Sequence, residues 1–176
     1  CMTEAQLSNA MDAYGSTVYR LALTRMQNIA DAEDVYQEVF LRLWKQAAED
    51  WDGDRAKAWL IRTTLNRCAD LHRFHLRRPV LSFAEIPDLA QPEDESRELW
   101  EAVSRLPEKA RTAVHLYYAE GYSAEEIGQL MHIPAATVRT RLHRARKQLK
   151  ELLGGIDDET CVSRSDGTNF GPQRAE

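Results

Sequence analysis

Cysteine, glycine and proline are all scarce in this chain of 176 residues, which holds three cysteines, eight glycines and six prolines. The cysteines follow no pairing motif, which excludes a disulfide framework and indicates a reducing compartment. Few helix breakers and the lack of apolar–polar alternation favour an all-α protein. No apolar run approaches the roughly 20 residues of a membrane span, and no secretory signal precedes Met2. We therefore expect a cytoplasmic protein without membrane insertion.

Charged residues are abundant, but their signs are unevenly distributed. The formal net charge of −5 argues against a uniformly basic surface. Residues 55–78 nevertheless hold seven Arg or Lys and one acid, whereas residues 79–101 hold seven acids and one base. Residues 135–150 then hold six Arg or Lys and no acid. Two basic segments separated by an acidic connector predict two contacts with anions on one chain.

The spacing of the apolar residues predicts two small helical domains joined by an irregular linker. The first domain covers residues 3–78. The linker covers residues 79–95, which contain three prolines and have no helical period. The second domain covers residues 96–153, and residues 154–176 form a polar tail that we expect to be disordered.

The first domain is expected to contain an N-terminal helix, a break over residues 28–32 and two further helices. Asp31 is the expected cap of a second helix that ends near Lys45. A third helix is expected from about Ala56 to His75. Residues 51–54, before it, are polar and contain Gly53, so they are expected to form a loop with that glycine as a hinge.

The most informative segment is residues 123–147. Ser123 followed three residues later by Glu126 matches a capping box, so a helix is expected to begin there. Pro134 suits the first turn of the next helix, which leaves His132 and Ile133 as a tight turn. Two helices joined by so short a turn indicate a helix-turn-helix unit. Gly128, on the first of these helices, lacks a Cβ and would let a neighbouring element approach closely.

The second helix of this unit has an apolar face and a basic face. The apolar face consists of Val138, Leu142, Ala145 and Leu149. The basic face consists of Arg139, Thr140, His143, Arg144 and Lys147. One face is suited to burial and the other to an anion, as a recognition helix in a DNA major groove requires. An ordinary helical hairpin with a solvated basic face is the alternative.

The third helix of the first domain also has two faces. Its apolar face consists of Ile61, Leu65, Cys68 and His72. The other face consists of Trp59, Arg62, Asn66, Arg67, Asp70 and Arg73. A ring, an amide and several cations together suit single-stranded DNA, because rings stack on bases, amides bond base edges and cations bind phosphates. For any single arginine, a solvated face is the alternative.

Three motifs, in this order, resemble those of bacterial sigma factors of the sigma-70 family. Residues 31–44 resemble their second conserved region, residues 58–67 their promoter-melting helix, and residues 106–147 their fourth region. The short linker is similar to that of the extracytoplasmic-function (ECF) group. The resemblance covers about residues 5–153. It implies an alternative sigma factor that binds core RNA polymerase and directs promoter recognition and DNA melting.

The resemblance also implies protein partners. The helix from Asp31 to Lys45 would dock on the β′ clamp helices of core RNA polymerase. The residues carried over for this contact are Asp34, Gln37, Glu38, Leu41 and Trp44. The β flap would contact the second domain, and an anti-sigma factor is a further expected partner. Taken without the family, the same helix reads as an amphipathic core helix, and its residues Val35, Val39 and Leu43 are expected to be buried.

Promoter DNA is the remaining partner that the resemblance implies. The residues carried over for the minus-ten element are Trp59, Arg62, Asn66, Arg67, Arg73, Arg77 and Arg78. Those for the minus-thirty-five element are Arg139, Thr140, His143, Arg144 and Lys147. Arg141, Arg146 and Lys147 are expected on phosphates. Residues 51–57 are expected to capture a flipped base, although they depart from the common family pattern.

Other functions find less support in the sequence. A stand-alone helix-turn-helix regulator would leave residues 31–44 without a role, and no dimerisation helix is evident. A metal site at Cys68, His72 and His75 would lack the fourth ligand usual in structural zinc sites. No glycine-rich phosphate loop and no activated nucleophile are recognisable. We therefore expect neither an enzyme nor a bound metal, cofactor or small-molecule substrate.

Overall fold

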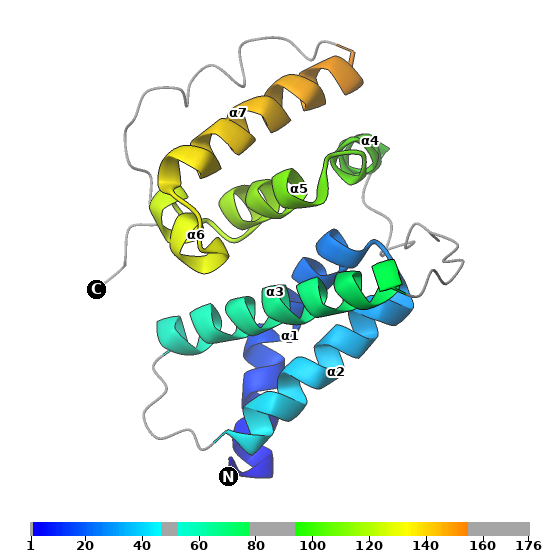
Figure 1. Cartoon of the computed structure of the whole chain (residues 1–176). Helices are drawn as coiled ribbons and strands as arrows, with labels where there is room; N and C mark the ends of the chain where they lie inside the picture. The colour runs from blue at the N-terminus through cyan, green and yellow to red at the C-terminus, as the bar shows by residue number, and fades with distance from the viewer. Residues whose placement is uncertain (1, 47–52, 78–93, 155–176) are drawn as a thin grey trace. The chain divides into compact units, whose positions relative to one another are not determined.

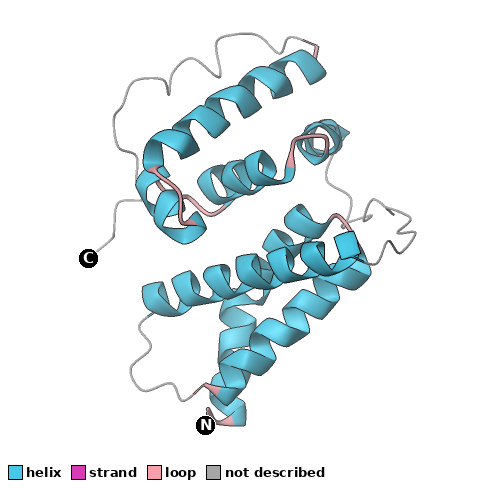
Figure 2. Ribbon diagram, in the orientation of Figure 1, coloured by secondary structure: helices cyan, strands magenta, loops and turns pink. Residues whose placement is uncertain are grey.

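The computed structural model describes residues 2–46, 53–77 and 94–154, and no strand occurs among them (Figures 1 and 2). The described helices form two compact units, one N-terminal and one C-terminal. The predicted all-α fold with two small helical domains is confirmed. None of the helices in the described part of the chain is long and apolar enough to cross a lipid bilayer.

The N-terminal unit consists of α1 (Glu4–Met26), α2 (Ile29–Lys45) and α3 (Gly53–Arg77), each of which packs on the other two. Their shared core is apolar and fully or almost fully buried, and it includes Val18, Leu21, Val35, Val39, Leu43, Leu60, Ile61 and Cys68. The expected burial of the inner faces of α2 and α3 is therefore confirmed. Figure 1 shows that α2 and α3 converge at the start of α2 and diverge toward its end.

The cap of α2 differs from the prediction. Asn28, not Asp31, is the N-cap residue, and its side-chain oxygen accepts a hydrogen bond of 3.0 Å from the backbone N–H of Asp31. Gln27 before it has a left-handed conformation with φ of 53°, which ends α1 and lets the chain turn. Asp31 thus lies inside the first turn, where its Oδ2 is 3.1 Å from Nε2 of His75 on α3. This contact joins the converging ends of the two helices.

The start of α3 also differs from the prediction. Residues 53 and 54 are helical rather than part of a loop, while residues 51 and 52 lie outside the described residues. The hydroxyl of Tyr14 on α1 donates a hydrogen bond of 3.1 Å to the carbonyl oxygen of Gly53. This contact from another helix holds the first turn of α3 in place.

The C-terminal unit consists of α4 (Asp94–Ser104), α5 (Glu108–Val114), the π-helical segment η1 (His115–Ala119), α6 (Ala124–Met131) and α7 (Ala135–Leu152). The π-helical segment continues α5 without a break, and α4, α5 and α6 all pack against α7. The side chain of Arg111 is buried and donates to the carbonyl oxygens of Ser104 and Leu106, at 3.3 and 2.9 Å. This arginine thus donates to backbone acceptors at and just after the C-terminal end of α4.

The helix-turn-helix unit of α6 and α7 has the predicted local chemistry. Ser123 and Glu126 form a reciprocal capping box at the start of α6. His132 takes a left-handed φ of 56°, and the N–H of Ile133 donates to the carbonyl of Gly128 at 2.9 Å. A Cβ added at Gly128 would lie 2.6 Å from the carbonyl oxygen of Ile133. Glycine is therefore required for this close approach, as the sequence predicts.

Candidate functional site

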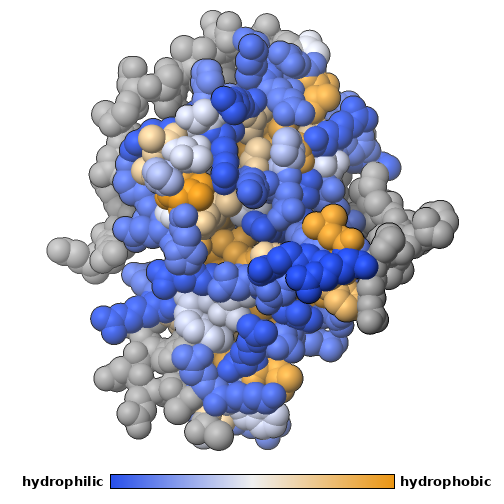
Figure 3. Space-filling model, viewed as in Figure 1, coloured by the Kyte–Doolittle hydropathy of each residue, from blue (hydrophilic) through white to orange (hydrophobic). Residues whose placement is uncertain are grey.

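The residues predicted to bind polymerase lie on the solvent side of α2. Asp34, Gln37, Leu41 and Trp44 are exposed and Glu38 is half-buried. Leu41 is 41% exposed and Trp44 is 48% exposed. Figure 3 shows that apolar side chains on the face in view form small patches among hydrophilic ones. Two large apolar groups on a polar stripe are suited to binding a protein partner.

The charge of this stripe is stabilised within α2. Nε of Arg42 donates to Oε1 of Glu38 at 2.9 Å, one helical turn away. This hydrogen bond is the main reason why the pKa of Glu38 is lowered from its ordinary value. The positive charges of Arg42, Arg67 and Lys45 lower the pKa further, while partial burial opposes the shift. Glu38 therefore keeps its negative charge at neutral pH.

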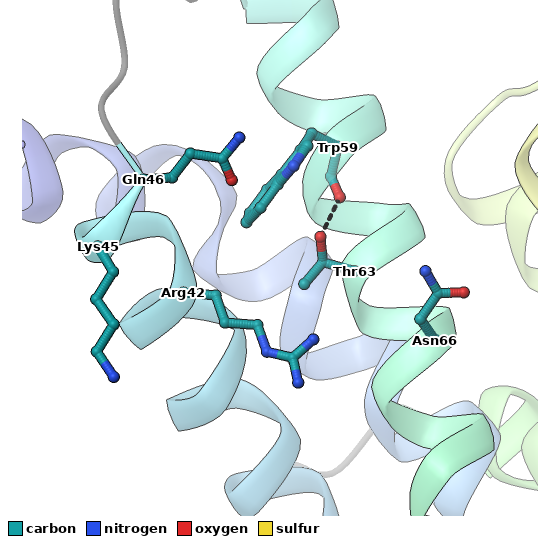
Figure 4. Close-up of a pocket in the computed structure, with 6 residues that line it drawn as sticks. All are labelled: Arg42, Lys45, Gln46, Trp59, Thr63 and Asn66. Atoms are coloured by element: carbon teal, nitrogen blue, oxygen red, sulfur yellow. Dashed lines mark hydrogen bonds between the residues drawn. The ribbon is translucent and has the colours of Figure 1, made fainter.

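A shallow pocket of about 390 Å³ opens where α2 and α3 diverge (Figure 4). It is lined by Arg42, Lys45, Gln46, Trp59, Thr63 and Asn66. Figure 4 shows Arg42 and Gln46 extending from α2 toward α3, where Trp59 and Thr63 lie on the facing side and Asn66 lies about one turn further along the helix. The Thr63 hydroxyl donates to the carbonyl oxygen of Trp59 at 2.8 Å, so its hydrogen is used within the helix. The pocket thus combines a ring, an amide and cations.

This pocket is lined both by residues predicted to contact DNA and by residues that were not. Trp59 and Asn66 are predicted DNA contacts, whereas Arg42, Lys45 and Gln46 belong to the helix predicted to bind polymerase. Sequence reasoning missed these three residues as pocket residues because they lie at the end of a different helix. Only the packing of α2 on α3 brings them beside Trp59 and Asn66. Their basic and amide character at the end of α2 was the available signal.

The other predicted minus-ten residues lie elsewhere on α3. A second hollow of about 530 Å³ is lined by Asp34 of α2 and by Arg67, Asp70, Leu71, Arg73, Phe74 and Arg77 of α3. Nη2 of Arg73 donates to Asp70 at 2.7 Å. Arg62 is exposed, and Arg78 lies outside the described residues. Of the predicted set, Trp59 and Asn66 therefore line one hollow and Arg67, Arg73 and Arg77 the other, while Arg62 lines neither.

The residues predicted to face the minus-thirty-five element are all exposed on α7, namely Arg139, Thr140, His143, Arg144 and Lys147. The opposite face is buried, with Val138, Leu142 and Ala145 at 0%, 2% and 1% exposure. The Thr140 hydroxyl donates to the carbonyl oxygen of Ala136 at 3.0 Å. The predicted division of α7 into a buried face and a basic face is confirmed for these residues, whereas Leu149 is only half-buried.

Two arginines of α7 have partners that the sequence did not indicate. Nη2 of Arg139 donates to Oε1 of Glu125 on α6. Nε of Arg146 donates to the hydroxyl of Tyr118 at 2.7 Å, and its guanidinium carbon lies 5.7 and 5.8 Å from the ring centroids of Tyr117 and Tyr118. Arg146, expected on a phosphate, thus joins α7 to η1 through a hydrogen bond and cation–π contacts.

The residues considered as metal ligands serve other roles where the structure describes them. Cys68 is buried in the core of the N-terminal unit. His75 faces Asp31, and His72 is half-buried. Within the described ranges, no group of three or more His, Cys, Asp or Glu side chains is placed to hold a metal ion.

Comparison with known proteins decides the family. The family model for Sigma-70 region 2 matches residues 10–78, and the model for Sigma-70, region 4 matches residues 96–149. The ECF RNA polymerase sigma factor SigM of Bacillus subtilis is 32% identical over 155 residues, which cover 83% of this chain and 94% of that protein. The chain belongs to the ECF sigma factors of the sigma-70 family.

Relatives of this sigma factor differ in length. SigE of Mycolicibacterium smegmatis, an ECF RNA polymerase sigma factor, is 34% identical over 161 residues, which cover 85% of this chain. The chain spans 62% of the length of that relative and 39% of the length of another one, from Xanthomonas campestris.

Solved structures of sigma factors share the fold. The sigma factor RpoE of Bartonella quintana, in complex with the anti-sigma factor NepR, matches with a TM-score of 0.72 and 24% identity, covering 85% of this chain and 98% of that chain. CnrH in complex with the cytosolic domain of CnrY matches with a TM-score of 0.61 and 25% identity, covering 88% of this chain and 92% of that chain.

Proposed function

We propose that this ECF sigma factor binds core RNA polymerase, directs it to promoters and helps to open the DNA duplex. The observation that carries the proposal is the presence of both sigma-70 regions, in order, on one chain. The protein acts in the cytoplasm, where the polymerase works, and it catalyses no reaction itself. Its effect on transcription comes from binding energy alone.

The exposed stripe of α2 is the proposed contact with the β′ clamp helices. Burial of Leu41 and Trp44 supplies most of the affinity, because large apolar groups dominate such interfaces. The carboxylates of Asp34 and Glu38 orient the encounter with a basic partner surface and raise its rate. The lowered pKa of Glu38 supports this role, since the carboxylate stays ionised.

The pocket between the diverging ends of α2 and α3 is the proposed site for an unstacked promoter base. The ring of Trp59 would stack on the base and the amide of Asn66 would bond its edge, while Arg42 and Lys45 would bind the adjoining phosphates. Base stacking on an aromatic side chain contributes about 1–3 kcal/mol, which offsets the few kcal/mol that unstacking costs. We therefore place base capture in this pocket, while the predicted capture by residues 51–57 stays a prediction, since residues 51 and 52 lie outside the described residues.

The basic face of α7 is the proposed contact with the duplex minus-thirty-five element. Arg139 and Arg144 would bond base edges in the major groove, where one bidentate pair with guanine discriminates by about 1–3 kcal/mol. Arg141 and Lys147 would bind phosphates and fix the helix in its register. The C-terminal unit would also contact the β flap.

An anti-sigma factor is a further proposed partner. The Bartonella quintana protein of the same fold was solved with the anti-sigma factor NepR. A sigma factor that occupies polymerase only on demand needs a protein that covers its polymerase-binding surface at other times. The α2 stripe, with its exposed Leu41 and Trp44, offers such a protein an apolar target.

Binding to purified core RNA polymerase tests the proposal. The full chain is expected to co-elute with core enzyme and to start transcription from members of a pool of candidate promoters. Trp44→Ala should weaken core binding by about 30-fold or more, as loss of a central aromatic anchor does. Ile29→Ala is the matched control, because Ile29 is also exposed on α2 but lies outside the stripe. A chain that ignores core enzyme and binds a duplex site alone would be a stand-alone regulator instead.

A further inference from the structure

The contact between Glu125 and Arg139 links the two helices of the helix-turn-helix unit. Glu125 lies in the first turn of α6, and Arg139 lies early in α7. Nη2 of Arg139 donates to Oε1 of Glu125 across a separation of 14 residues in sequence. The side chains remain 58% and 59% exposed, so both are still accessible to a partner. The ion pair therefore restrains Arg139 without burying it.

The backbone on both sides of this pair is held by hydrogen bonds and by packing. The N–H of Ile133 bonds the carbonyl of Gly128, and Val138 is fully buried below the start of α7. The neighbouring acid, Glu126, is committed to the capping box, where its Oε2 accepts from the N–H of Ser123 at 2.9 Å. Of the two adjacent acids, one therefore holds the backbone of α6 and the other holds a side chain of α7.

We propose that Glu125 is a specificity-determining residue that positions the Arg139 guanidinium for base recognition. The inference rests on the proposed function, because it needs α7 to enter the major groove. A guanidinium has five N–H donors, so one bond to Glu125 leaves enough donors for a bidentate pair with guanine. Holding a long side chain in place before binding reduces the conformational entropy lost on binding.

The acid also limits the alternatives open to Arg139. An arginine without a partner can swing to a phosphate, a contact that carries no sequence information. The carboxylate of Glu125 neutralises part of this attraction and repels the DNA backbone. An exposed ion pair contributes little to fold stability, so a purely structural role would leave this pair with almost no measurable effect.

The test uses holoenzyme assembled from core RNA polymerase and the full chain. Wild-type holoenzyme first selects its preferred sequence from a duplex library randomised at both promoter elements. Dissociation constants are then measured for the preferred duplex and for each single-base change in its upstream element. The variants are Glu125→Ala, Glu125→Gln, Arg139→Ala and the double variant Glu125→Ala/Arg139→Ala. Glu151→Ala is the control, because it removes the same charge from an exposed position near the end of α7.

Glu125→Ala should reduce discrimination about three- to fivefold at the one position where Arg139→Ala also reduces it. Other positions should keep their discrimination. The double variant should discriminate no worse than Arg139→Ala alone, which is the signature of one residue acting through another. Glu125→Gln should lose less than Glu125→Ala, because a neutral oxygen can still accept a bond. Glu151→Ala should change no position.

Unchanged discrimination in both Glu125 variants would overturn the inference while leaving the proposed function intact. A uniform gain in affinity that leaves the discrimination at every position unchanged would overturn it as well, because Glu125 would then act only by repelling phosphates. A wild-type holoenzyme that selects no upstream sequence would instead contradict the proposed function, and the inference with it.

Discussion

The cations of α7 have different surroundings from those of α2 and α3. In the N-terminal unit, cations lie beside carboxylates of the same helix: Arg42 bonds Glu38 at 2.9 Å, and Arg73 bonds Asp70 at 2.7 Å. In the C-terminal unit, residues 135–150 of α7 contain no acid at all. The acid that Arg139 bonds comes from α6.

This difference matches two kinds of nucleic-acid contact. A surface of mixed charge attracts DNA phosphates weakly, so we propose that recognition by the N-terminal unit depends on the ring of Trp59 and the amide of Asn66. An unbroken basic face attracts duplex phosphates strongly and at long range. We therefore propose that the N-terminal unit binds a strand that polymerase has already brought close, and that α7 finds the duplex site.

The units also differ in how their helices approach one another. A Cβ added at Gly15 of α1 would lie 3.0 Å from the hydroxyl oxygen of Tyr36, the end of a side chain. A Cβ added at Gly128 of α6 would lie 2.6 Å from the backbone oxygen of Ile133. A side chain can move by a few tenths of an ångström, whereas the backbone of a two-residue turn cannot. The C-terminal unit is thus the less tolerant of added volume.

Of the variants that test this comparison, Gly128→Ala should have the largest effect on stability. Overpacking costs about 1–3 kcal/mol, and we expect about 2 kcal/mol of destabilisation in the C-terminal unit. Gly15→Ala should change stability by less than about 1 kcal/mol, because the gain in helix propensity offsets a small shift of Tyr36. Hydrogen exchange on the full chain locates each effect, with protection lost in α6 and α7 for Gly128→Ala alone. Equal losses in both variants would contradict the contrast between the units.

The salt dependence of DNA binding should distinguish the two proposed DNA contacts, and the expected change in free energy is smaller. Lys147→Ala removes an exposed cation of α7, so the slope of log K against log salt should fall by about 0.9 for holoenzyme on a duplex carrying the upstream element. Arg62→Ala removes an exposed cation of α3 and should lower the slope by about 0.7 on a promoter with a premelted downstream element. Each variant should leave the other probe unchanged. A shared effect on both probes would mean that the two surfaces do not bind separate elements.

The predictable features of this protein are local in sequence. The buried stripe of α7 follows from the 3.6-residue spacing of Val138, Leu142 and Ala145, and the start of α6 follows from Ser123 and Glu126. Both features depend on residues within a few turns of one another. Periodicity and capping chemistry therefore sufficed for the helix faces and for the turn.

The features that sequence reasoning missed depend on contacts between helices. The partner of Arg146, Tyr118, is 28 residues away and lies in a π-helical segment, which has no simple sequence pattern. Gly53 begins α3 although its surroundings have the composition of a loop, and its carbonyl oxygen accepts a hydrogen bond from Tyr14 of α1. Asn28 and Asp31 are both good caps, and only the backbone conformation decides between them. These features depend on tertiary packing, which local sequence patterns do not encode.

The smallest predicted effect concerns the pKa of the Glu38 carboxylate, which accepts a hydrogen bond from Arg42. Arg42→Ala should raise the pKa of Glu38 toward its ordinary value, because the variant removes both the hydrogen bond and a positive charge. Lys45→Ala, the matched control, removes only a charge and should raise the pKa less. Carbon-13 NMR titration of the Glu38 carboxyl measures both shifts, and equal shifts would show that charge rather than the hydrogen bond dominates.

The same pair makes a small, pH-dependent contribution to the stability of the N-terminal unit. Because the folded-state pKa of Glu38 lies below the unfolded-state value, its stabilisation is present above the unfolded-state pKa and is lost as the pH falls through the folded-state one. For an exposed pair one turn apart, this amounts to about 0.3–0.5 kcal/mol. Between about pH 5 and pH 3, the wild type should therefore lose slightly more protection at the α2 amides than Glu38→Gln does. No comparable loss should occur along residues 135–150 of α7, which contain no carboxylate to protonate, and a matching acid-induced loss there would erase the distinction between the two cationic surfaces.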